Sequence, residues 1–119
     1  MGLDNYAMRA PGEQLTEEDV EAFEAADIKL CSGVFSGGEA SFRGKVYDDP
    51  VLEITGESLY QEWIPPERVE KMYEALMKCN PEEAAKGDYR YSTTESEIIN
   101  LRKFFKVCAE RNLGLHGWS

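Results

Sequence analysis

Apolar side chains recur with helical spacing in the last quarter of the chain, between Thr94 and Asn112. They are three or four residues apart: Ile98, Leu101, Phe105 and Cys108. Two overlapping pairs fit a capping box at its start, Ser92 with Glu95 and Thr94 with Glu97; in such a box each side chain bonds the backbone N–H of the other residue. We therefore predict a helix here, with one face buried in the core.

Two further helices are predicted from the same kind of pattern. One lies between Pro66 and Asn80, and its apolar face comprises Val69, Met72, Tyr73, Leu76 and Met77. The other runs from Thr16 to about Ala26, because Thr16 can cap a first turn that is rich in acidic residues. Its apolar stripe is thin, so we expect a surface helix.

A β-hairpin is predicted in residues 28–47. Residues 28–35 and 40–47 are rich in β-forming side chains, and the turn formers in 36–39 separate them. Strand alternation in the second segment places three side chains on one face: Arg43, Lys45 and Tyr47.

The remaining segments complete the predicted fold. Residues 48–56 can form a short helix, residues 81–87 another turn or two, and residues 3–8 and 113–118 short strands. Length and hydrophobic content suit one core. We therefore predict a single α+β domain over residues 1–119, with a small, mostly antiparallel sheet packed against two or three helices.

The distribution of charge narrows the classes of partner. Residues 1–64 carry 14 acidic and 4 basic side chains, whereas residues 65–119 carry 9 of each, so the whole net charge of −10 lies in the first half. Such a field repels phosphate backbones and anionic lipid headgroups. We expect no direct nucleic-acid or membrane contact, and a basic protein is the partner that this charge favours.

The cysteines and the hydropathy indicate in which cellular compartment the protein functions. Cys31, Cys79 and Cys108 are widely spaced and form no Cys-x-x-Cys pair, and the chain has one histidine, so neither a disulfide framework nor a zinc site is predicted. Apolar runs are too short to cross a bilayer, and the opening lacks the features of a signal peptide. We expect a soluble cytoplasmic protein with no metal and no cofactor.

Five residues are candidates for a small-ligand site. Arg43 and Lys45 can hold a carboxylate or phosphate, although ion pairs with the surplus carboxylates are the alternative interpretation. Tyr47, His116 and Trp118 can shape a pocket around such an anion, because glycines flank the last two.

Other side chains suggest an interface or a nucleophile. Tyr60 and Trp63 precede two prolines and can anchor a contact with another molecule or a second copy, or else close the edge of the core. Cys108 and His116 could form a thiol–imidazole dyad, but a cysteine on an apolar helix face is expected to be inert.

Four segments carry a resemblance to other proteins: Met1–Tyr6, Ser41–Tyr47, Thr55–Tyr60 and Leu113–Trp118. On these segments the chain resembles a loose group of small, uncharacterised bacterial and phage proteins. No activity is attached to that group, so the resemblance implies a bacterial or phage source and assigns no site residue.

Two functions remain open at this point. The first is a non-catalytic acidic module, similar in logic to an inhibitor or immunity protein, that engages a basic partner. The alternative is a small anion-binding protein or small enzyme with its site near Arg43, Lys45 and His116. We favour the first, and therefore expect no catalytic residues; the sequence leaves the oligomeric state open.

Overall fold

Our computed structural model describes residues 2–118, which form an α+β fold. The strands are β1 (Asp4–Met8), β2 (Val34–Ser36), β3 (Glu39–Phe42), β4 (Trp63–Ile64) and β5 (Gly114–Trp118). The helices are α1 (Glu17–Ala25), α2 (Gly44–Thr55), α3 (Pro66–Lys78), α4 (Pro81–Ala85) and α5 (Glu95–Glu110). The predicted class, α+β with a small antiparallel sheet against helices, is confirmed.

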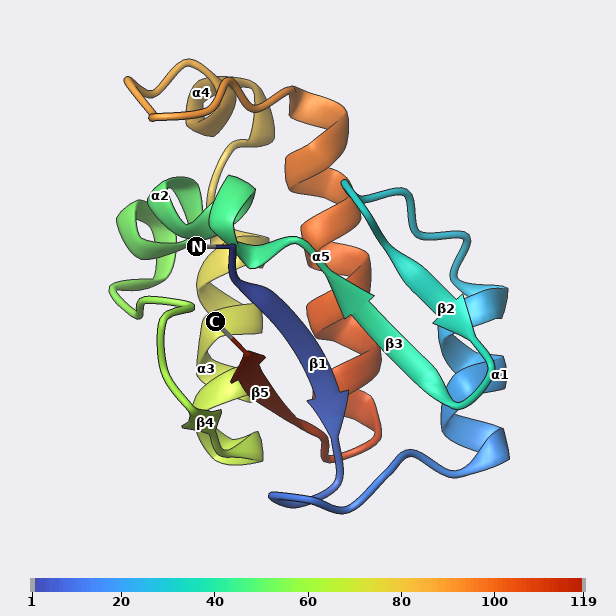
Figure 1. Cartoon of the computed structure of the whole chain (residues 1–119). Helices are drawn as coiled ribbons and strands as arrows, with labels where there is room; N and C mark the ends of the chain where they lie inside the picture. The colour runs from blue at the N-terminus through green and yellow to red at the C-terminus, as the bar shows by residue number, and fades with distance from the viewer. Residues whose placement is uncertain (1, 119) are drawn as a thin grey trace.

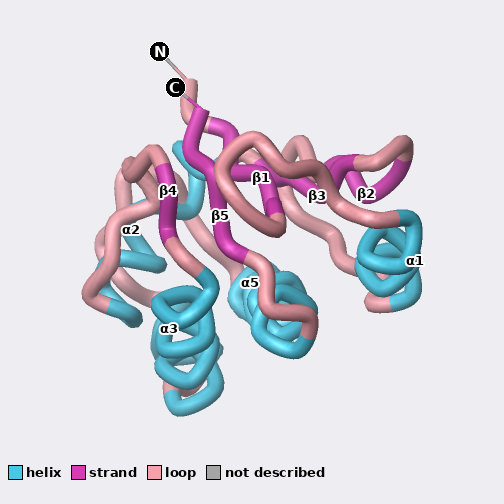
Figure 2. Tube along the Cα trace, turned by 90° about the horizontal axis from the view of Figure 1, so that it is seen from below, coloured by secondary structure: helices cyan, strands magenta, loops and turns pink. Residues whose placement is uncertain are grey.

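The five strands form one sheet in the order β2-β3-β1-β5-β4, and all neighbouring strands are antiparallel. The first and last strands pair at its centre, which brings the two ends of the chain together (Figure 1). Seen along its edge, the sheet has α1, α5 and α3 on one side (Figure 2). The other side carries no helix within residues 2–118, and we call it the open face.

Strand alternation divides the side chains of β1 between the two layers. Asn5 and Ala7 are buried toward the helices. The other β1 side chains are half-buried and belong to the open face: Asp4, Tyr6 and Met8. The core beneath is largely aromatic, with the Phe104 ring 4.8 Å from Phe42 and 5.0 Å from Phe23, measured between centroids.

The helices predicted from periodicity are confirmed as α1, α3 and α5. Thr16 and Thr94 both cap through their side chains, and each belongs to a complete capping box. Local sequence is sufficient for these elements, because periodicity and cap lie within the same few residues. No helix within the described part of the chain combines the length and hydropathy needed to cross a bilayer.

The predicted hairpin is confirmed only around its turn. β2 and β3 flank Gly37 and Gly38, which both have positive φ. Residues 28–33 form no strand, because the chain turns there and Ser32 has a φ of 53°. Strand geometry also ends before residue 43, so the prediction for residues 43–47 is wrong.

The end of the predicted second strand instead begins α2, four residues before the predicted helix. A distant carbonyl supports this start: Leu3 O accepts a hydrogen bond from the Lys45 N–H at 3.2 Å. Gly44 lies against the buried Asn5 side chain, where a Cβ would overlap Asn5 Oδ1. Gly56 ends the helix with a φ of 78°, as predicted.

A buried carboxylate fixes the loop between β1 and α1. Asp19 is fully buried and accepts hydrogen bonds from Arg9 Nε and Nη2, both at 2.8 Å, and from Arg111 Nε at 2.6 Å. Burial alone would raise the pKa of Asp19. Hydrogen bonds from the Thr16 N–H and the two guanidinium groups outweigh this effect and lower the pKa to about 2. The clamp joins this loop, α1 and the end of α5.

Candidate functional site

The five predicted ligand-site residues fall into two groups. Arg43, His116 and Trp118 lie on or at the edge of the open face, because Arg43 pairs with Asp4 and the other two alternate outward from β5. Tyr47 is instead buried in the core on α2, and the Lys45 ammonium lies 5.9 Å from the centroid of the Tyr91 ring. Of the five, therefore, only His116 and Trp118 are neighbouring rings, and Arg43 shares their face through its pair with Asp4.

Tyr47 has a structural role that the strand assignment did not predict. Its hydroxyl accepts a hydrogen bond from the Cys31 N–H at 2.8 Å and donates one to Glu97 Oε2 at 2.7 Å. Burial, followed by the hydrogen bond to Glu97, raises the pKa of Tyr47 far above its ordinary value. Tyr47 thus joins α2 to the start of α5 and is closed to a ligand.

One side chain from every strand forms a row across the open face. The pairing register aligns Val34 of β2, Ser41 of β3, Tyr6 of β1, His116 of β5 and Trp63 of β4. All but Ser41 are at least partly exposed. The row therefore places three partly exposed rings side by side, which makes it a candidate binding surface.

Trp118 extends this row into a cluster of rings. The His116 ring lies 6.5 Å from Tyr6 and 6.2 Å from Trp118 between centroids, and Trp118 is 66% exposed. We call Tyr6, Trp63, His116 and Trp118 the aromatic cluster. The predicted interface residues flank or join it: Trp63 is a member, and Tyr60, 50% exposed, lies beside Trp118 along a shallow groove.

A backbone contact fixes the orientation of the His116 ring. Its Nδ1 lies 2.9 Å from the Glu62 carbonyl oxygen, to which the Gly117 N–H also donates. Because a carbonyl only accepts, Nδ1 carries the proton in this contact. In the neutral ring Nε2 then keeps its lone pair and can accept a hydrogen bond from a ligand.

The Tyr6 hydroxyl is held in its neutral form in this setting. Burial, then the nearby carboxylates of Asp4 and Glu39, raise the pKa of Tyr6, and Arg43 opposes them. The hydroxyl therefore stays protonated near neutral pH and is unsuited to act as a base. Because Asp4 pairs with Arg43, the net negative charge beside Tyr6 comes from Glu39.

Asp4 forms an ion pair with the Arg43 guanidinium group at the edge of the open face. Its Oδ1 lies 3.1 Å from Arg43 Nε, and both side chains are more than one third exposed. Arg43 therefore makes the ion pair with a carboxylate that the sequence suggested as the alternative to anion binding. An incoming anion would have to compete with Asp4 for the guanidinium group.

A hollow of about 480 Å³ adjoins the aromatic cluster. It lies among β1, the loop that follows it, the β2–β3 turn and the end of β5. Its lining includes Tyr6, Met8, Gln14, Leu15, Glu39 and Trp118. A cavity of this size accommodates one or two side chains of a partner, or a small ligand.

The exposed carboxylates of the acidic half gather only in part. Six follow one another along α1 and its flanks: Glu13, Glu17, Glu18, Glu21, Glu24 and Asp27. Asp19 and Glu57 are paired with arginines, and the acidic residues of α2 lie at the other end of the molecule from α1 (Figure 1). Within the described part of the acidic half, α1 and its flanks therefore carry the longest series of exposed carboxylates.

The thiol–imidazole dyad is excluded by the sheet. Cys108 is fully buried on α5, on the helix side, whereas His116 faces the open side. Burial also raises the pKa of the Cys108 thiol far above its ordinary value, which makes it unreactive. Within residues 2–118, no group of three or more His, Cys, Asp or Glu side chains is placed to hold a metal ion.

Sequence reasoning found part of this site and missed the rest. His116, Trp118 and Trp63 were candidates, but Tyr6 was not. The alternation of residues 3–8 was a usable signal, since it separates Tyr6 from the buried Asn5. The strand order that brings Tyr6 beside His116 was not predictable from that segment alone.

Comparison with protein families, with curated proteins and with solved structures gives no match for this chain. The bacterial or phage source implied by the resemblance therefore stays a prediction, and the site rests on its own geometry.

Proposed function

We propose that the protein is a non-catalytic binding module whose open face receives basic side chains of a protein partner. The observation that carries the proposal is the aromatic cluster with carboxylates beside it. Asp4 and Glu39 lie close enough to Tyr6 to affect its pKa, and Glu62 is exposed next to Trp63.

Aromatic faces and carboxylates suit the same ligand groups. An ammonium or guanidinium group over an aromatic ring gains about 0.5 to 2 kcal/mol, depending on how far it is desolvated. A carboxylate at the rim adds a charge-assisted hydrogen bond. Lysine and arginine side chains satisfy both requirements, whereas a phosphate group would meet the negative surroundings of Tyr6.

The acidic surface of α1 would guide such a partner toward the protein. α1 contains no basic residue in its nine positions, and its exposed carboxylates extend the negative field beyond the open face. Long-range attraction of this kind raises association rates and weakens as salt is added. We expect the encounter to take place in the cytoplasm, in keeping with three unpaired cysteines.

Intrinsic tryptophan fluorescence gives a direct test. Both tryptophans of the chain, Trp63 and Trp118, belong to the aromatic cluster, so their emission reports on the open face. A lysine-rich extended peptide should change this emission saturably, and the same peptide with glutamate in place of lysine should not. The affinity should fall as salt is raised.

A matched pair of variants separates the site from total charge. Glu39→Lys beside the hollow should weaken peptide binding by about tenfold, since it opposes the incoming cation. Glu82→Lys changes the charge equally on α4, far from the cluster, and should have a much smaller effect. Equal losses in both variants would show that only net charge attracts the peptide, and would contradict the proposal.

An anion site is the second candidate, and one observation favours it. Arg43, Trp118 and the Nε2 of His116 belong to the same face, which also contains the hollow. Inorganic phosphate should then shift the NMR signals of His116, the single histidine, and Arg43→Ala should abolish the shift. No shift at high phosphate concentration would remove this candidate.

A further inference from the structure

A second hollow adjoins the one beside the aromatic cluster. Its volume is about 430 Å³, and it lies between α1 and the β2–β3 turn. Leu15 and Gly38 belong to the linings of both hollows, so the two hollows meet at these residues. We call the first the aromatic hollow and the second the α1 hollow. Together they form one path across the surface, from Trp118 to α1.

The α1 hollow is apolar at its base and open toward the turn. Leu15 is half-buried and Val20 is buried, and both contribute apolar side chains to the lining. Gly37 and Gly38 face α1 across the hollow and have no side chains to fill it. The aliphatic stems of lysine or arginine side chains can pack on such a base while their charged groups stay at the rim.

A row of carboxylates on α1 forms the rim on the helix side. Its members are exposed and line the hollow: Glu17, Glu21 and Glu24. They are four and three residues apart, so they share one face of the helix. Within residues 2–118 none of them makes an ion pair, so their charges are available to a ligand.

We propose that the α1 hollow binds a second stretch of the basic partner, so that an extended lysine- or arginine-rich segment runs from the aromatic hollow past Leu15 and Gly38 and along α1. The inference rests on the proposed function, because the segment is anchored at the aromatic cluster. It adds the form of the partner: a continuous basic segment in place of one or two isolated side chains. It also gives the α1 carboxylates a direct contact, beyond long-range attraction.

The spacing of the carboxylates suits an extended chain. A helical rise of about 1.5 Å per residue places Glu21 about 6 Å from Glu17 along the axis, and Glu24 about 4.5 Å further on. In an extended chain, alternate residues lie about 6.6 Å apart and point to the same side. Basic side chains at every second position can therefore meet successive carboxylates of the row.

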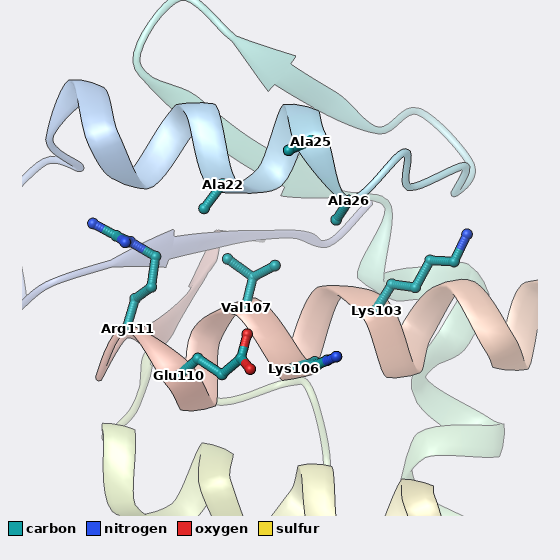
Figure 3. A pocket seen from close by; sticks show the side chains of 8 residues that line it. All are labelled: Ala22, Ala25, Ala26, Lys103, Lys106, Val107, Glu110 and Arg111. Carbon is teal, nitrogen blue, oxygen red and sulfur yellow. The ribbon is translucent and has the colours of Figure 1, made fainter.

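The other side of α1 has the opposite charge and would reject such a segment. There, three alanines of α1 face Lys103 and Lys106 of α5 across a separate hollow (Figure 3). Glu110 also lines it and offsets one positive charge, while the charge of Arg111 is balanced by Asp19. The lining therefore stays net positive and repels a basic segment. Charge thus directs the partner to the α1 hollow.

Two lysine-rich peptides of different length test the proposal on the full chain. A peptide of about five residues covers about 16 Å and occupies one hollow, whereas one of about twelve residues covers about 40 Å and reaches both. Binding is followed by the emission of Trp63 and Trp118, which reports on the aromatic hollow. The longer peptide should bind at least about tenfold more tightly, since its second half adds contacts to an anchored ligand.

Neutral substitutions then locate the second contact. Glu21→Gln/Glu24→Gln should weaken binding of the longer peptide about threefold to tenfold, as expected for two exposed ion pairs, and should barely affect the shorter peptide. Glu13→Gln/Glu18→Gln is the matched control. It removes the same charge from α1 and its flank, but neither residue lines either hollow, so binding should change by less than about twofold. Circular dichroism checks that every variant is folded.

Four outcomes would overturn the inference, and they separate it from the proposed function. If neither peptide changes the tryptophan emission, both proposals fail. If the two peptides bind equally well and Glu21→Gln/Glu24→Gln has no effect, the aromatic hollow remains a site and only the α1 hollow is excluded. Equal losses in the two double variants would mean that α1 acts at a distance alone. Tighter binding of the longer peptide with glutamate in place of lysine would show that the occupant is acidic.

Discussion

Asp19 holds a negative charge in the interior, and its two arginines make this tolerable. Asp19→Asn removes that charge and leaves Arg9 and Arg111 facing a neutral amide. We expect a loss of about 2 to 4 kcal/mol in the free energy of unfolding, measured with urea at neutral pH. Glu17→Gln, in the same first turn but exposed, should cost less than about 0.5 kcal/mol.

The same residue predicts a pH dependence. Its pKa is about 2 in the folded protein, against an ordinary value of 3.8, so the unfolded chain binds this proton more readily. The stabilisation, on the order of 2 kcal/mol, is present above pH 4 and is lost as the pH falls toward 2. The difference in unfolding free energy between the wild type and Asp19→Asn should therefore shrink as the pH falls from about 4 toward 2. A difference that stays constant would contradict this.

Gly44 owes its identity to one neighbour. A Cβ there would overlap Asn5 Oδ1. The Asn5 side chain is held in place because its Nδ2 donates a hydrogen bond to the Leu59 carbonyl at 3.1 Å. Gly44→Ala should therefore lower the unfolding free energy by about 1 to 3 kcal/mol. In an Asn5→Ala background the same change should cost less than half as much. Equal costs in both backgrounds would place the strain elsewhere.

At the scale of elements, Tyr47 shows why local patterns were insufficient. Residues 40–47 alternate like a strand, yet Tyr47, Pro50, Val51 and Ile54 also follow helical spacing. The Leu3 carbonyl and the packing of Gly44 on Asn5 favour the helix, and both partners lie about forty residues away. The helices with caps in their own sequence were predictable because they need no such partner.

The link between α2 and α5 can be tested through the Tyr47 hydroxyl. Tyr47→Phe removes two hydrogen bonds and leaves Glu97 without one donor, so we expect a loss of about 1 to 2 kcal/mol in unfolding experiments. Tyr60→Phe, at an exposed ring, should change stability by less than about 0.5 kcal/mol. Similar values for the two variants would argue against the bridge.

At the scale of the whole molecule, the candidate site depends on strand order. His116 and Trp118 could be identified from their own segment, but their neighbour Tyr6 is more than a hundred residues away in sequence. The composition of the chain shows the excess of carboxylates. Only the structure shows which of them lie on α1, which lie on α2 and which are paired with arginines within the molecule. Sequence therefore identified members of the site without its layout.

The same strand order predicts a gradient of stability across the sheet. β1 pairs with β5 over five residues and with β3 at Asn5 and Tyr6, whereas β2 and β4 each have one neighbour. In native-state hydrogen exchange, amides of β1 and β5 that bond to a neighbouring strand should exchange slowest. Faster exchange in β1 than in β2 would contradict this topology.

The one-sided placement of the helices has a consequence for valency. α1 and α5 lie behind the sheet (Figure 2), and the side chains of the aromatic cluster belong to the open face, so a contact made through these helices leaves the cluster uncovered. Copies of the chain that are held by the helix side would therefore keep their rings free. A partner that displays repeated lysines or arginines could engage the rings of two such copies at once, and it would bind more tightly than through either single contact because of effective concentration alone.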